Sequence, residues 1–230
     1  MRFIISAKAK RKLVLSFVVL AVIVVLICVS SAGSGDVPVS AFSPISRIDT
    51  PSPIYTVIAV TENKTNAETL EIFAGICVGF GIEPTVFTRT DNIGTTDGVL
   101  STVGGFSYEY GLLCENTEKM SRSSFMKYLA LGNDEFYRVC GKHSACVYIN
   151  GAGSPYASEV MASYGQYGIT YSVFSGRSDS VRNGDIIAVD ITDKDSVYGL
   201  VELLSHAASV GLKCVPMKEY IREYESIAES

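Results

Sequence analysis

The stretch that decides the fold is YTVIAVTENKTNAETLE, residues 55–71. An apolar run rich in β-branched residues ends at Thr61, polar residues follow, and Thr65-Asn66-Ala67-Glu68 has the spacing of a helix capping box. A buried strand that leads straight into a helix is the repeating unit of α/β folds with a parallel sheet. Such folds place their chemistry at the carboxyl ends of strands, so Glu62 and Asn63 are the first candidate site residues.

The same alternation of strand and helix patterns continues to the C-terminus. Besides the first strand at 56–61, strands are predicted at 84–88, 106–113, 146–149, 169–174, 185–189 and 212–216. Helices are predicted from the capping box to Gly81, at 121–139, from Ser154 to about 167, at 196–210 and at 218–227, with a loop rich in Gly and Thr before 106. About seven strands alternating with helices fit an open doubly wound sheet or a small barrel, and periodicity does not separate the two.

The N-terminus has the pattern of a membrane anchor. Residues 1–12 carry five basic side chains and no acid, and the 18 residues 13–30 contain no charge. That length is close to the ~20 residues of a spanning helix, and the basic flank favours a cytoplasmic N-terminus. A cleaved signal peptide is the alternative, because small residues follow at Ser30-Ser31-Ala32. We predict a linker at 31–53, rich in Ser, Pro and Gly, and a folded domain outside the cytoplasm at 54–230.

Charge and cysteine content exclude several classes of protein. Removing the five basic residues of the N-terminus from the chain's 19 Lys and Arg leaves 14 against 24 Asp and Glu, and such an acidic domain is a poor partner for nucleic acid. There is no C-x-x-C pair, so a zinc cluster is not expected. Cys140 and Cys146 could form a small disulfide loop outside the cytoplasm, with two unpaired thiols as the alternative. His143 and His206 are interpreted as surface or helix-packing residues.

Several segments together resemble the polysaccharide deacetylase (NodB homology) family of carbohydrate esterases over nearly all of 56–227. The family strand ending in T-F-D-D-G is similar to VTENK at 60–64, and its G-H-E-I-G-N-H-T-x-x-H segment is similar to SYEYGLLCENT at 107–117. The family's R-P-P-Y-G is similar in position to NGAGS at 150–154, and G-x-I-I-L-L-H-D to GDIIAVDI at 184–191. The resemblance implies a distorted (β/α)7 barrel, here preceded by a transmembrane helix.

The family's chemistry is not matched at these positions. In the family, an Asp and two His bind a divalent metal, a second Asp is the base, an Arg orients it and a late His is the general acid. Carried over, the vestigial catalytic positions are Glu62, Asn150 and Asp190, and the vestigial metal positions are Asn63, Leu113 and Thr117. One aliphatic side chain and two neutral oxygens cannot replace a carboxylate and two imidazoles. Without a metal to lower the pKa of bound water to about 7, amide hydrolysis should be lost, and we expect no metal or other cofactor.

The resemblance without its chemistry implies a membrane-anchored pseudoenzyme that binds a cell-wall polysaccharide or an envelope protein. Tyrosine rings stack on sugars, which adds two tyrosines to the strand-end residues. The candidate substrate-binding residues are Glu62, Asn63, Tyr108, Tyr110, Asn150 and Asp190. One alternative is a residual carbohydrate deacetylase or hydrolase that uses Glu62 and Asp190, since glycoside hydrolysis needs two suitably spaced acids. A second alternative is a scaffold that acts through protein contacts alone.

Overall fold

The structure is a computed structural model that describes residues 42–61, 66–151, 153–177 and 180–229. These residues belong to one unit of the chain, Ser40–Ser230. Within this described part, no helix is both long enough and apolar enough to cross a lipid bilayer. The predicted transmembrane segment 13–30 lies outside the described residues.

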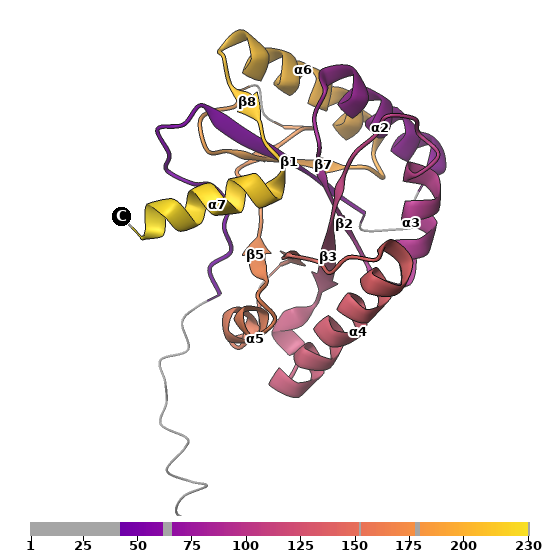
Figure 1. Cartoon of the computed structure of the whole chain (residues 1–230), viewed down its shortest axis with the longest axis vertical. Helices are drawn as coiled ribbons and strands as arrows, with labels where there is room; N and C mark the ends of the chain where they lie inside the picture. Colours follow the sequence, from indigo (N-terminus) through magenta and orange to yellow (C-terminus); the bar gives the residue numbers. More distant parts are fainter. Residues whose placement is uncertain (1–41, 62–65, 152, 178–179, 230) are drawn as a thin grey trace, which may run out of the picture. The chain divides into compact units, whose positions relative to one another are not determined.

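The centre of the fold is a curled half-barrel of parallel strands (Figure 1). The strand order is β5-β4-β3-β2-β1-β7-β6, and β8 pairs with β1 off this path. The strands are β1 (Ile54–Val60), β2 (Thr85–Thr88), β3 (Glu109–Glu115), β4 (Cys146–Asn150), β5 (Tyr167–Ile169), β6 (Val173–Phe174), β7 (Ile186–Asp190) and β8 (Lys213–Cys214). The predicted α/β class with a parallel sheet is confirmed.

Helices cover the sheet between successive strands, as a right-handed α/β layer requires. They are α2 (Ala67–Phe80), α3 (Ile93–Leu100), α4 (Arg122–Cys140), α5 (Ala157–Ser163), α6 (Lys194–Ser209) and α7 (Met217–Ala228), with short 3-10 turns at Thr90–Asn92 and Thr117–Lys119. Helix α2 begins and ends at the residues that the sequence predicts. The Asn66 side chain accepts from Glu68 N at the start of α2, and Gly81 ends α2 in the left-handed conformation.

Alternation along the strands sorts side chains to two faces of the sheet. On β3, Leu112 and Cys114 pack outward against α4, and Leu113 packs inward with Phe87 and Tyr148. The inner face is apolar near its centre and is closed from one side by α7, whose buried residues include Tyr220. The interior of the half-barrel is therefore a packed core, and only the ends of the strands can carry a site.

Four element boundaries differ from the sequence prediction. Helix α3 lies in the segment expected to be a loop, because its two glycines and two threonines mask a buried side formed by Ile93, Thr96 and Leu100. Strand β3 starts at Glu109 rather than 106 and continues to Glu115. Helix α5 starts at Ala157, and Ser154 accepts from Tyr156 N in the turn before it. The strand predicted at 169–174 is split into β5 and β6.

Residues 42–52, predicted to be part of the linker, form a strap on the domain. Ile45 bridges to Ile169 at edge strand β5, and Ile48 N donates to Gly184 O just before β7. Ile45 and Ile48 are both buried. Gly184 is required there, because its φ is +74° and a Cβ would lie 1.9 Å from the Ile48 carbonyl oxygen. The folded domain therefore begins before Ile54.

Candidate functional site

Parallel pairing brings the carboxyl ends of the strands to one edge of the sheet. Asn150 ends β4 in register with Glu115, the last residue of β3, and Asp190 ends β7 in register with Val60 of β1. Asn150 and Asp190 are four strand spacings apart, about 19 Å along the sheet. Because the sheet is curled, the straight distance between the two residues is shorter than this path.

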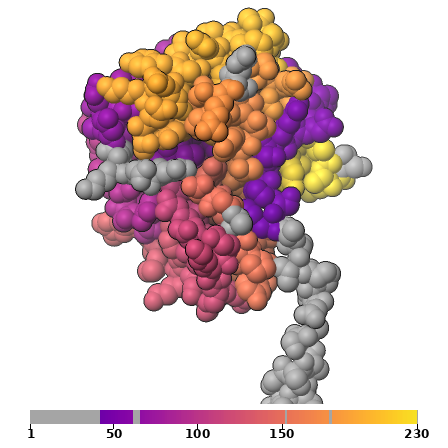
Figure 2. All heavy atoms as spheres, turned by 180° about the vertical axis from the view of Figure 1, so that it is seen from behind, coloured from indigo at the N-terminus to yellow at the C-terminus, as the bar shows by residue number. Residues whose placement is uncertain are grey.

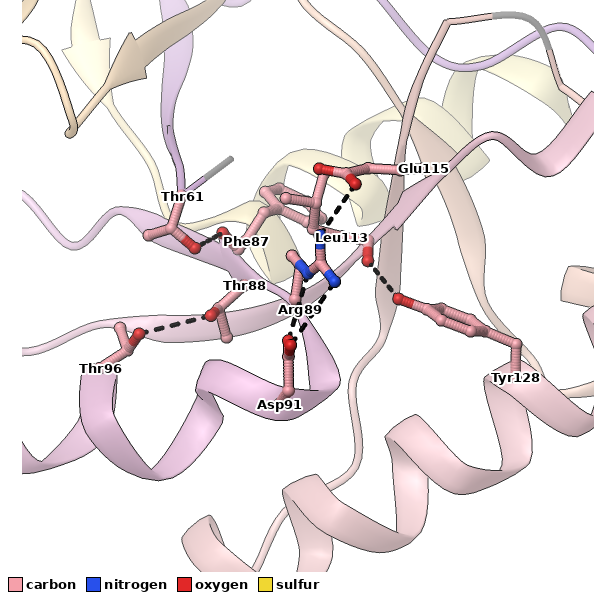
Figure 3. A network of polar contacts seen from close by, with 9 residues as sticks. All are labelled: Thr61, Phe87, Thr88, Arg89, Asp91, Thr96, Leu113, Glu115 and Tyr128. Carbon is pink, nitrogen blue, oxygen red and sulfur yellow. Dashed lines mark hydrogen bonds and ion pairs between the residues drawn. The ribbon is translucent and has the colours of Figure 1, made fainter. Parts of the chain in front are cut away.

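Position 113 lies on the inner face of the sheet and is part of the core. Leu113 is fully buried, in register with Tyr148 and in the same apolar cluster as Phe87 and Val60. Its carbonyl oxygen accepts from the Tyr128 hydroxyl over 2.8 Å, so helix α4 fixes the backbone at this point (Figure 3). The residue at the position where the family resemblance places a metal-binding histidine is therefore a packing residue.

Thr117 also lies in the interior of the domain. It is fully buried in the 3-10 turn that follows β3, and its carbonyl oxygen accepts from Met120 N. The turn begins at Asn116, whose φ of 53° is in the left-handed region that Asn tolerates better than most residues. Thr117 therefore presents a buried neutral hydroxyl where the family resemblance places a histidine.

A guanidinium lies between the ends of β2 and β3. Arg89 follows β2 and donates from Nη1 to Glu115 Oε2 over 3.0 Å, and from Nε to Asp91 Oδ1 over 3.2 Å (Figure 3). The hydrogen bond to Asp91 raises the pKa of Arg89 further above its usual range, and both carboxylates add to the shift. The strand ends therefore carry an ion-paired guanidinium that the sequence analysis did not single out.

The sequence analysis did not select Arg89 or Glu115, for two different reasons. Arg89 directly follows the predicted strand 84–88, so the strand-end rule would have found it. Glu115 was hidden because the strand was predicted to end at 113, two residues too early. Residues two apart on a strand share a face, so the longer strand places Glu115 on the same inner face as Leu113.

Asp190 is held in a local turn at the end of β7. Its Oδ1 accepts from Thr192 N over 2.9 Å and from the Thr192 hydroxyl over 2.6 Å. Its backbone N donates to Ser196 Oγ in the first turn of α6, and Ser196 contacts the hydroxyl of Ser175 over 2.7 Å. One carboxylate oxygen is thus engaged, and the residue is partly exposed at the edge.

The structure separates the two tyrosines from this edge. Tyr110 lies at the start of β3, at the opposite end of the strand, and its ring packs on Phe136 of α4. Asp97 of α3 accepts from the hydroxyls of Tyr110 and Tyr108, over 2.5 and 3.1 Å. Burial and the bond to Asp97 raise the pKa of Tyr110. A groove at the carboxyl edge does not contain these residues, because β3 carries them to the other end of the sheet.

The cysteines and histidines also lie away from the edge. Cys140 and Cys146 are both free thiols, with Cys146 on the inner face and Cys140 packed on the outer side. The disulfide considered from the sequence is therefore not formed. His143 stacks on Tyr137 with ring centroids 4.9 Å apart, and His206 Nδ1 accepts from Val181 N over 3.4 Å.

The described residues do not fit a transition metal. Among them, no three His, Cys, Asp or Glu come together as a group that could hold an ion. Leu113 supplies no ligand atom, and the Glu115 carboxylate at the neighbouring strand end is already paired with Arg89. Glu62 and Asn63 lie outside the described residues, so the edge is known from Arg89, Glu115, Asn150 and Asp190.

Comparisons with known proteins agree with this architecture. No protein-family model matches the sequence, and no curated protein matches it. Solved structures of family 4 carbohydrate esterases (CE4) do match. A CE4 pseudoenzyme from Bacillus anthracis has a TM-score of 0.68 at 13% identity, over 79% of this chain and 69% of that one.

Two other solved structures have the same fold. A family 4 carbohydrate esterase from Bacillus anthracis has a TM-score of 0.65 at 14% identity, over 77% of this chain and 86% of that one. The peptidoglycan deacetylase PdaC from Bacillus subtilis has a TM-score of 0.58 at 10% identity, over 79% of this chain and 96% of that one. The predicted resemblance to polysaccharide deacetylases and their pseudoenzymes is thereby confirmed at the level of fold.

Proposed function

Because the described part of this chain has the fold of the family 4 carbohydrate esterases, we propose that it is a catalytically inactive protein of this fold that binds cell-wall polysaccharide. The proposal places the domain outside the cytoplasm, on a membrane anchor formed by residues 13–30. The observation that carries the loss of activity is Leu113, an aliphatic core residue at the position of a metal-binding histidine.

The carboxyl edge supports polysaccharide as the ligand. It offers an amide at Asn150 and carboxylates at Glu115 and Asp190, which together donate and accept hydrogen bonds as sugar hydroxyls require. These groups come from the carboxyl ends of β3, β4 and β7, so they offer several points of contact to a chain of sugars. One solved neighbour is a peptidoglycan deacetylase, so the same fold handles a wall polymer in another protein.

The first experiment tests inactivity. The full-length chain, purified in mild detergent, should hold no stoichiometric zinc, cobalt or nickel and should release no acetate from acetylated chito-oligosaccharides or peptidoglycan. Acetate release that Glu62→Gln abolishes would instead establish the residual enzyme. A tightly bound metal ion in the wild-type chain would overturn the assignment of Leu113 and Thr117 as non-ligands.

The second experiment tests the ligand. Retention of the chain on insoluble peptidoglycan should fall in Asn150→Ala and Asp190→Asn variants. Asp134→Asn is the matched control, since Asp134 is an exposed carboxylate on α4, away from the edge. If retention is absent, while an envelope protein is captured in a manner that depends on Asn150 and Asp190, a protein partner replaces the polysaccharide.

A further inference from the structure

A hollow of about 430 Å³ opens beside the carboxyl end of β6. Its walls are the segment 175–177, which follows β6, and one face of α6 with Asp195, Tyr198, Gly199 and Glu202. In Figure 2 the orange segment after β6 lies against the yellow-orange helix α6 at the surface. The volume is within the range of small-molecule sites.

The helix presents its residues to this hollow because of their spacing. Asp195, Gly199 and Glu202 follow at intervals of four and three, so they lie on one face of α6. Asp195 and Glu202 are about 10 Å apart along the helix axis. Gly199 between them lets the 175–177 segment approach, since a Cβ there would lie 2.2 Å from the Ser175 carbonyl oxygen.

The hollow carries charges of both signs that are not neutralised. The Arg177 guanidinium lies 5.7 Å from the centre of the Phe174 ring. Within the described part of the chain, Arg177, Asp195 and Glu202 form no ion pair with any residue. Other exposed acids do find partners, as Glu68 does with Lys194 over 2.7 Å. The three groups remain available to a ligand of complementary charge.

We propose that this hollow binds a free diamino monocarboxylic acid, that is, a lysine-like amino acid. The ligand carboxylate pairs with Arg177, which is shaped for bidentate binding of a carboxylate. Its two ammonium groups pair with Asp195 and Glu202, and its methylene chain packs on the ring of Tyr198, which is 54% exposed. One cation and two anions on the protein thus meet two cations and one anion on the ligand. The hollow lies next to Asp190, since Ser175 in its wall contacts Ser196, which accepts from Asp190 N. The proposed ligand goes beyond the proposed function.

A second charged hollow, at the other end of the sheet, provides a control for the proposed binding site. It has about 380 Å³ at the amino ends of the strands and contains Glu109, Lys142 and Lys218. There Glu109 Oε2 already accepts from Lys218 N over 3.2 Å and from Thr85 Oγ1 over 3.4 Å. Ligands of parallel α/β folds bind at the carboxyl ends, where the hollow beside β6 lies. Lys142→Gln is therefore a matched control for Arg177→Gln.

The test is titration calorimetry on the full-length chain with three probes. L-Lysine carries all three charges, 1,5-diaminopentane lacks the carboxylate, and 6-aminohexanoic acid lacks the α-ammonium group. Lysine should bind about tenfold or more tightly than either analogue, which corresponds to one lost charge-assisted contact. Arg177→Gln should abolish the preference for lysine over 1,5-diaminopentane, and Glu202→Gln should weaken lysine and 1,5-diaminopentane alike.

The control variant Lys142→Gln should bind lysine as the wild-type chain does. Equal affinities for the three probes, a preference that survives Arg177→Gln, or no heat of binding at millimolar lysine would each overturn the proposal. Both substituted side chains of the hollow are exposed, so circular dichroism should show an unchanged fold for each variant.

Discussion

Arg89 donates to Glu115 over 3.0 Å between the ends of β2 and β3, at the strand edge where a metal-dependent deacetylase of this fold would concentrate its ligands. The guanidinium is satisfied by two carboxylates, so it is a structural charge rather than a free anion-binding group. Beside it, Leu113 continues the apolar core up to the edge. Both residues stabilise this edge through contacts within the protein.

Leu113→Ala should destabilise the domain far more than Glu115→Gln. Leu113 is fully buried, and truncating such a leucine costs about 2–5 kcal/mol in unfolding free energy. The Arg89–Glu115 pair has side chains 40% and 28% exposed, so its loss should cost below about 1 kcal/mol. Urea denaturation of the two variants measures both values. Equal losses would mean that position 113 is not a packing position.

Ile48→Ala should show that the strap 42–52 is part of the domain. Ile48 is only 3% exposed and packs on the inner face, so its truncation should lower the unfolding free energy by about 2–4 kcal/mol. Val210→Ala is the control, because Val210 is 54% exposed after α6 and should change stability by less than about 0.5 kcal/mol. If residues 42–52 were a linker, neither substitution would change the unfolding free energy.

Stability should fall as the pH rises above 9. Burial raises the pKa of the Cys214 thiol from near 9 to about 12, and burial also raises the pKa values of Cys77, Cys114 and Cys146. The folded state therefore keeps protons that the unfolded state loses, so this contribution is complete below pH 9 and disappears as pH approaches 12.

Urea unfolding at pH 8 and pH 10.5 should differ by at least about 2 kcal/mol. Cys214→Ala should reduce that difference. A flat profile over this interval would show that the thiols ionise as readily in the folded chain as in the unfolded one. At pH 8, alkylation of these four thiols should require unfolding, since the thiolate is the reactive form.

Asp97→Ala should affect stability without affecting the polysaccharide edge. Asp97 accepts from Tyr108 and Tyr110, and the loss of a charged acceptor for these partly buried hydroxyls costs about 1–3 kcal/mol. Retention on peptidoglycan, measured per folded molecule, should match that of the wild-type chain. A selective loss of retention in Asp97→Ala would instead indicate that Tyr108 and Tyr110 belong to the ligand-binding surface.

Much of the fold was predictable because it depends on short-range patterns. The β-branched run at 54–60, the cap at Asn66 and the stop at Gly81 act within a few residues, and they define the first strand and helix. Helix α3 was missed because its composition disfavours a helix, and burial of Ile93 and Leu100 against the rest of the domain overrides that preference.

The sequence by itself determined the parallel α/β class, because residue identity decides apolar periodicity, and it predicts the absence of a metal ligand at position 113. Leu113 cannot coordinate a cation in any fold. Only the tertiary structure decided which polar residues share the edge, since strand register pairs Asn150 with Glu115 and sends Tyr110 to the opposite end. Tertiary packing also decided that residues 42–52 belong to the domain, because the contacts of Ile45 and Ile48 are with strands more than 100 residues away.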